Sequence, residues 1–232
     1  MASLLMHLAA TCLAMRELGI SDAQLLIGAV LPDFGTRGNA HYRVGDRRVT
    51  IDLMHAAEEL KPDKDSMCLG YMLHLAQDIA FRRYLTEARG IKLTRRNTQR
   101  LHEDYAALNR CLAERYALKI PNVPTEVSTA IADRFAPSLG ALRTELERDF
   151  SAEVPAGHSF RVMDKASADA FIDHAAQITA AQIKSLQASG RPYAEAQYYW
   201  KVPHRSGVWV KVKRKLRAAK RRMCRLLSGR HC

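Results

Sequence analysis

The sequence lacks an apolar run long enough to cross a membrane. Although 47% of its 232 residues are hydrophobic, no stretch reaches the ~20 uninterrupted apolar residues that a membrane-spanning helix needs. Residues 3–15 are apolar enough to suggest a signal peptide, but no basic residue precedes them and His7 interrupts the run. We therefore expect this segment to be the first helix of a cytoplasmic protein, with a peripheral position at the inner face of the membrane as an alternative.

Paired cysteines are also missing. The five cysteines lie at positions 12, 68, 111, 224 and 232, and no two of them have the spacing of a CxxC motif. An odd number without paired spacing argues against a disulfide framework and against a thiolate zinc site. We expect the cysteines to be reduced, as in an intracellular protein.

Alternating β-strand patterns are scarce. Apolar residues instead recur every three to four positions along most of the chain, as in amphipathic helices. The sequence therefore predicts an all-α protein with one compact multi-helix domain at residues 1–200 and a basic helical tail at residues 201–232. Capping residues, prolines and glycines set the boundaries. Helices are expected at 3–18, 21–30, 51–60, 65–88, 94–118, 125–149 (with a kink at Pro137) and 166–189, and an irregular loop at 34–49.

Acidic residues are absent from the tail. Residues 1–200 hold 24 Lys/Arg and 24 Asp/Glu, whereas residues 201–232 hold 12 Lys/Arg and no acid, so the whole net charge of +12 belongs to the tail. We expect residues 208–227 to form a basic amphipathic helix that binds an anionic membrane surface. A solvated extension without a partner and a nucleic-acid arm are the alternatives, and nucleic acid is the less favoured. The apolar positions of this helix, spaced by four and three, are Val212, Leu216, Ala219, Met223 and Leu226.

His74 and Asp78 are the most informative polar residues, because they lie four positions apart in the apolar stretch Met67–Phe81. On a helix the two side chains share one face. A buried carboxylate without a partner is costly or takes up a proton, whereas a divalent cation compensates its desolvation. The pair therefore predicts a metal site, and a buried His–Asp hydrogen bond without metal is the alternative.

Three further candidate ligands precede this pair. They are His7 on the first helix, Asp33 directly after the proline that ends the second helix, and His41 in the glycine-containing loop. All are nitrogen or oxygen donors, a set that suits zinc or another divalent metal. Taken alone, His7 is more often a hydrogen-bonded core histidine than a ligand.

In this order the residues resemble the zinc-dependent phospholipase C family, whose all-α fold is shared with the S1/P1 nucleases. The matching motifs are His7, Leu-Pro-Asp ending at Asp33, His41, and Gly-Tyr-x-x-His-x-x-x-Asp over residues 70–78. Residues 102–109 match the family more weakly. The resemblance covers the chain up to Asp78. It implies that Asp33, His41, His74 and Asp78 bind one zinc ion, that Asp78 bridges to a second, and that His7 binds this second ion.

The chain departs from the family in two respects. The secreted enzymes use a free amino terminus as a ligand, whereas six residues precede His7 here, and we expect that ligand to be missing. A further zinc in the family is held by a His and a His-x-x-x-Glu pair, which has no match after His74. The available substitutes are His102, Asp104, His158 and His174. His102 and Asp104 are favoured because they lie in the weaker match at residues 102–109. We therefore expect one or two Zn²⁺ ions, or another divalent metal, rather than three.

The resemblance implies hydrolysis of a phospholipid or another phosphodiester. Zinc lowers the pKa of a bound water to ~7, and two metals ~3.5–4 Å apart can hold the attacking and leaving oxygens in line. Asp33 is the candidate general base. One alternative is a non-catalytic helical metal-binding or membrane-associated module that keeps the fold with a reduced metal site. In another, the core is inert and the tail is a membrane or nucleic-acid anchor.

Overall fold

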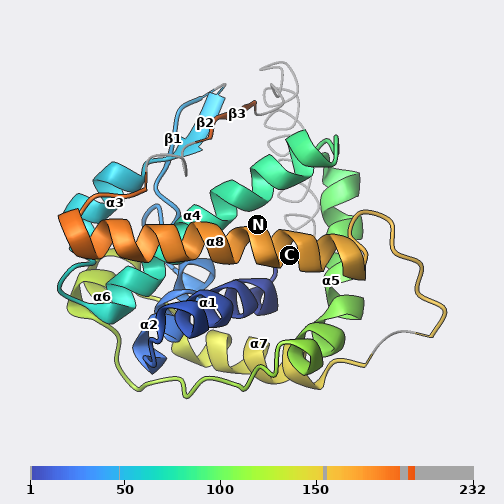
Figure 1. Cartoon of the computed structure of the whole chain (residues 1–232), viewed down its shortest axis with the longest axis horizontal. Helices are drawn as coiled ribbons and strands as arrows, with labels where there is room; N and C mark the ends of the chain where they lie inside the picture. Colours follow the sequence, from blue (N-terminus) through green and yellow to red (C-terminus); the bar gives the residue numbers. More distant parts are fainter. Residues whose placement is uncertain (1, 47, 154–155, 194–197, 202–232) are drawn as a thin grey trace, which may run out of the picture.

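Most of the described chain is helical (Figure 1). The computed structural model describes residues 2–46, 48–153, 156–193 and 198–201. The predicted mostly helical domain is confirmed, whereas the tail from residue 202, with the amphipathic helix expected at 208–227, lies outside the described residues. The α-helices of the described part are α1 (Leu4–Leu18), α2 (Ala23–Gly28), α3 (Leu53–Leu60), α4 (Ser66–Arg83), α5 (Arg95–Arg115), α6 (Thr129–Phe135), α7 (Leu139–Ser151) and α8 (Lys165–Ser189).

Short polar side chains begin many of these helices at the places that the sequence predicts. Each accepts a hydrogen bond from a backbone N–H of the first helical turn, which would otherwise lack a partner. Glycines in the left-handed conformation end α1 and α8. The N-terminal capping residues of α1, α2, α4 and α8 are Ser3, Asp22, Asp65 and Asp164.

Helix α4 forms the centre of the domain. Every residue from Met67 to Phe81 is buried, because α2, α3 and α8 all pack against this helix. Helix α8 also packs along α1, and in Figure 1 it crosses the view with α1 below it and the C-terminal part of α4 rising above it. Polar side chains in the middle of α4 are therefore shielded from water on every side.

Helices α2 and α4 touch through their backbones at Gly28 and Gly70. A methyl group added to Gly28 would overlap the Met67 carbonyl oxygen, and one added to Gly70 would overlap the Leu25 carbonyl oxygen and lie 2.9 Å from the Ala29 nitrogen. Only glycine permits this approach. It brings the end of α2, and the 3-10 turn that follows it, against the middle of α4.

The chain also forms three short strands that the sequence pattern does not predict. Strands β1 (Arg43–Val44), β2 (Arg48–Ile51) and β3 (Trp200–Lys201) pair antiparallel in the order β1-β2-β3. The expectation of an irregular loop over 34–49 is therefore wrong in its second half. Gly45 has a φ of 93°, which allows the chain to turn after β1. The sequence pattern misses these strands because segments of two to four residues are too short to show an alternation.

The helix expected at 125–149 is divided into α6 and α7. Ala136 takes a left-handed conformation with φ of 40° and ends α6. Pro137 follows it, and a proline disfavours the helical conformation of the residue before it. The predicted kink is thus a complete break. Among the described residues, none of the helices combines the length and the hydrophobicity needed to cross a membrane.

Candidate metal centre

His74 and Asp78 lie side by side on α4 in a fully buried environment. Both side chains have an exposed fraction of 0%. The Nδ1 of His74 lies 2.9 Å from the carbonyl oxygen of Ala29. A carbonyl can only accept a hydrogen bond, so Nδ1 carries the proton and Nε2 keeps a free electron pair. Burial lowers the pKa of His74 to about 3, which leaves its imidazole neutral and available as a ligand.

His7 on α1 is oriented by an equally specific contact. The hydroxyl of Thr179 donates to the Ala175 carbonyl at 2.7 Å, so its oxygen accepts the hydrogen bond from Gln77 Nε2 at 2.9 Å. Gln77 Nε2 also donates to Thr11 at 3.0 Å. The amide oxygen of Gln77 therefore faces His7 Nδ1, 2.7 Å away, and must accept its proton. Nε2 of His7 is consequently a bare acceptor as well.

The two oriented histidines meet the carboxylate of Asp78. Their rings are stacked with centroids 4.0 Å apart, and His7 Nε2 lies 3.7 Å from Asp78 Oδ1. The same oxygen accepts a hydrogen bond from the backbone nitrogen of Ala2 at 3.3 Å. His7, His74 and Asp78 form the first ligand group, since their donor atoms lie within 4.8 Å of one another.

Asp33 and His41 approach the same point from the other side. Asp33 belongs to the 3-10 turn η1 (Leu31–Phe34), which follows α2, and His41 lies in the loop before β1. His41 Nε2 is 3.2 Å from Asp33 Oδ1 and 3.4 Å from His74 Nε2. With His74, they form the second ligand group. His41 Nε2 also lies 3.8 Å from Asp78 Oδ2, so Asp78 reaches both groups.

The arrangement of these atoms fits a cation. Among the described residues, His7 Nε2 and Asp78 Oδ2 are buried without any hydrogen-bond partner, and the bare Nε2 of His74 lies 3.8 Å from the Asp33 carboxylate. Electron pairs that face one another in a dry interior are unfavourable unless a positive charge lies between them. Neutral imidazoles held by a second hydrogen bond are typical metal ligands. The two groups could therefore hold a divalent metal.

The carboxylates of the centre are held in the ionised form. Burial alone would raise the pKa of Asp78, but the attraction of neighbouring positive charge lowers it below the ordinary value. At Asp33 burial likewise opposes ionisation, but the pKa is lowered, and the hydrogen bond with His41 contributes to this. The site thus offers two anionic groups to a cation.

Asp33 connects the centre to solvent. Its side chain is 20% exposed, whereas Asp78 is 0% exposed. A cleft of about 660 Å³ opens beside it, between the start of α1, α5 and α7. Polar residues of this cleft include His102, Asn109 and Arg148. A small molecule in the cleft would meet the centre at Asp33.

The structure does not bring His102 and Asp104 into either ligand group. His102 is exposed on α5 and lines the cleft beside Asp33. The buried carboxylate of Asp104 accepts hydrogen bonds from the backbone N–H groups of residues 161, 162 and 163, the shortest at 2.7 Å, and lies 3.0 Å from His158 Nε2. Asp104 therefore holds the loop before α8, and its oxygens are already engaged.

The other candidate positions also lie outside the centre. His174 is exposed and lines a separate pocket on α8. A His-x-x-x-Glu pair does occur before His74: His55 and Glu59 are 3.6 Å apart on α3, and Glu59 also pairs with Arg134 at 2.7 Å. Within the described chain neither belongs to a ligand group.

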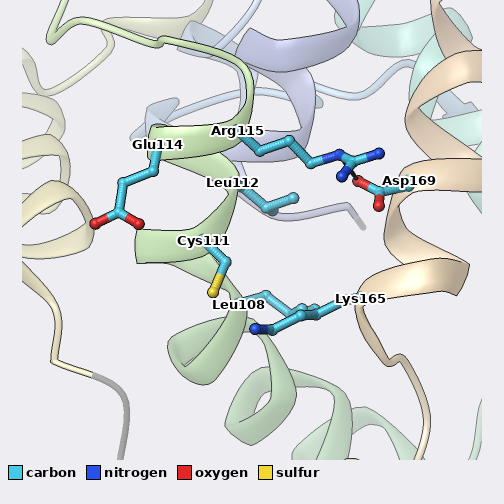
Figure 2. Close-up of a pocket in the computed structure, with 7 residues that line it drawn as sticks. All are labelled: Leu108, Cys111, Leu112, Glu114, Arg115, Lys165 and Asp169. Carbon is cyan, nitrogen blue, oxygen red and sulfur yellow. Dashed lines mark ion pairs between the residues drawn. The ribbon is translucent and has the colours of Figure 1, made fainter.

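Figure 2 shows another pocket, of about 450 Å³, between α5 and α8. Arg115 and Asp169 face each other across it at 2.9 Å, and Glu114 points away from this pair. None of the described residues that line it is a histidine. It is therefore unrelated to the metal centre.

Comparisons of the chain with protein-family models, with curated proteins and with solved structures found no match. The metal centre is therefore argued from the positions of its own side chains. The resemblance to the phospholipase C family stays a prediction from the motifs.

Proposed function

We propose that the protein binds one or two divalent metal ions, zinc in the first place, and hydrolyses phosphodiester bonds in the manner of the phospholipase C family. The observation that carries the proposal is the pair of overlapping ligand groups that Asp78 links. Because His74 has one free nitrogen, it would bind only one of two ions. A carboxylate between two groups is the usual way to hold two metals close together.

The residues of the candidate centre would have distinct roles. His7, Asp33, His41, His74 and Asp78 would bind metal, with Gln77 and the carbonyl of Ala29 fixing the two buried imidazoles. Asp33 faces both the centre and the cleft, so it is placed to accept a proton from an attacking water. A bound zinc ion would polarise the phosphoryl oxygen and acidify that water.

The cleft supports a substrate of moderate size. Its volume of about 660 Å³ falls within the ~300–1,000 Å³ typical of small-molecule sites. A phosphodiester headgroup would fit, and a bound metal would offset the repulsion between its phosphate and the cleft carboxylates Asp33, Glu145 and Asp149. We propose a phospholipid as the first substrate class to test, because residues 201–232 carry 12 Lys/Arg and no acid and would favour an anionic bilayer.

The activity is tested on protein loaded with zinc, using a chromogenic phosphodiester and short-chain phosphatidylcholine. We expect zinc-dependent hydrolysis of at least one substrate, which Asp33→Asn lowers by 100-fold or more and the exposed control His174→Ala leaves unchanged. Stoichiometric metal without hydrolysis of either substrate would refute the hydrolase and support the non-catalytic metal-binding module.

The membrane part of the proposal has its own test. Removal of residues 205–232 should lower binding to anionic vesicles in a sedimentation assay at low salt. Hydrolysis of the soluble phosphodiester should persist, because both ligand groups of the described chain lie between His7 and Asp78. Unchanged vesicle binding would refute membrane attachment through the tail.

A further inference from the structure

A second cavity, of about 1,020 Å³, lies between the three-stranded sheet and the C-terminal end of α4. Its lining comes from β1, from the turn after α4 and from the segment that leads into β3. None of the metal ligands lines it. Whatever occupies this cavity is therefore distinct from a ligand of the metal centre.

The lining of the cavity is strongly basic. Arg43, Arg82 and Lys92 contribute three positive charges, and no Asp or Glu is among its described lining residues. The neighbouring Arg83 differs, because it pairs with Glu87 at 2.9 Å outside the cavity. Such a surface attracts an anion.

Arg82 shows most clearly that an anion is needed. In the described part of the chain its guanidinium makes no ion pair, and its Nε is buried without a hydrogen-bond partner. The guanidinium lies 4.3 Å over the ring of Trp200, which holds it in place and leaves its N–H edge for another group. Burial lowers the pKa of Arg82, and the charge of Asp78, one turn before it on α4, opposes this shift only in part.

Aromatic side chains form the other wall of the cavity. Tyr198, Tyr199 and Trp200 follow one another in the sequence and all line it. Tyr199 is 52% exposed, an unusual position for a large ring. Tyr198 is fixed by a 2.9 Å hydrogen bond between its hydroxyl and that of Thr86. The cavity therefore offers rings for an apolar or planar group beside cations for a negative one.

We propose that this cavity binds an organic phosphate, with the phosphate between Arg82, Arg43 and Lys92 and the organic part against the tyrosines. A guanidinium donates two parallel hydrogen bonds to phosphate oxygens, and a lysine ammonium adds a further positive charge. The same chemistry is presented by a soluble phosphate monoester and by the headgroup of phosphatidic acid. The site does not depend on the proposed hydrolysis.

Trp200 provides a local readout. The chain has two tryptophans, so the Trp209→Phe variant reports on Trp200 alone. Phenyl phosphate and inorganic phosphate are titrated into this full-length protein, and the fluorescence emission of Trp200 is followed. We expect saturable binding, tighter for phenyl phosphate. Arg82→Gln should weaken it at least tenfold, and Lys92→Gln, on the exposed rim, should weaken it several-fold without risk to the fold. Arg83→Gln should change it less than twofold.

Vesicles of phosphatidylcholine with and without phosphatidic acid distinguish the two sources. Binding to phosphatidic acid that Arg82→Gln lowers and Arg83→Gln does not would identify a lipid headgroup, and binding of soluble phosphates alone would identify a free ligand. The proposal is overturned if neither phosphate binds at millimolar concentration. It is overturned equally if Arg82→Gln and Arg83→Gln have the same effect, since that would indicate general attraction to a basic surface.

Discussion

Replacing Gly70 with alanine tests the contact that positions the metal centre. The added methyl group would overlap the carbonyl oxygen of Leu25 and lie 2.9 Å from the Gly28 Cα, and a backbone cannot avoid it by changing a rotamer. Overpacking of this kind costs up to about 3 kcal/mol, while alanine in a helix gains about 1 kcal/mol over glycine. The net loss of about 2 kcal/mol corresponds to a decrease in Tm of about 4–8 °C for a chain of this size.

Gly140→Ala is the matched control. Gly140 lies on α7, and a methyl group there meets nothing within 4 Å. This variant should therefore gain stability, by up to about 1 kcal/mol. The assay is thermal unfolding followed by circular dichroism, with metal affinity as a second readout, because a displaced α2 moves the Ala29 carbonyl away from His74. A Gly70→Ala protein that is as stable as the parent and binds metal equally well would refute the reasoning.

Three further predictions concern stability and reactivity. Asp104→Asn should lower the free energy of unfolding by about 2–3 kcal/mol, because an amide nitrogen would face backbone donors. Limited proteolysis should then detect cleavage in residues 156–163, and an uncut loop would contradict the prediction. In native protein at pH 8, iodoacetamide should label the partly exposed Cys111 faster than Cys68, because burial raises the pKa of the Cys68 thiol to about 12. Peptide mapping by mass spectrometry measures the ratio of the two labelling rates. Equal rates would contradict the prediction. Removing metal with a chelator should lower Tm by about 5–11 °C if the metal had been present at 100 times its dissociation constant; an unchanged Tm would argue against a bound ion.

The helices could be predicted because their signals are local. Apolar spacing and capping residues such as Ser3 and Asp65 are readable within one turn of the chain. The pairing of β2 with β3 is not readable in this way, because Val49 and Trp200 come from opposite ends of the sequence. No local pattern specifies such a contact.

The convergence of the candidate ligands could be predicted for a different reason. A histidine and a carboxylate four residues apart in an apolar helix leave few explanations, and His7, Asp33 and His41 share the same donor chemistry. The role of Gln77 could not be predicted, since it depends on hydroxyls from α1 and α8. The same holds for Asp104, whose backbone partners lie 57 to 59 positions away.

Metal content is the most direct test of the account. The protein is purified without chelator or affinity-tag metal and measured by elemental analysis beside a His74→Ala/Asp78→Ala variant and the exposed control His174→Ala. The account predicts one or two equivalents of zinc or another divalent metal in the parent and the control, and none in the double variant. A metal-free parent, together with a double variant that folds as stably as the parent, would contradict it and show that the buried His–Asp pair is structural.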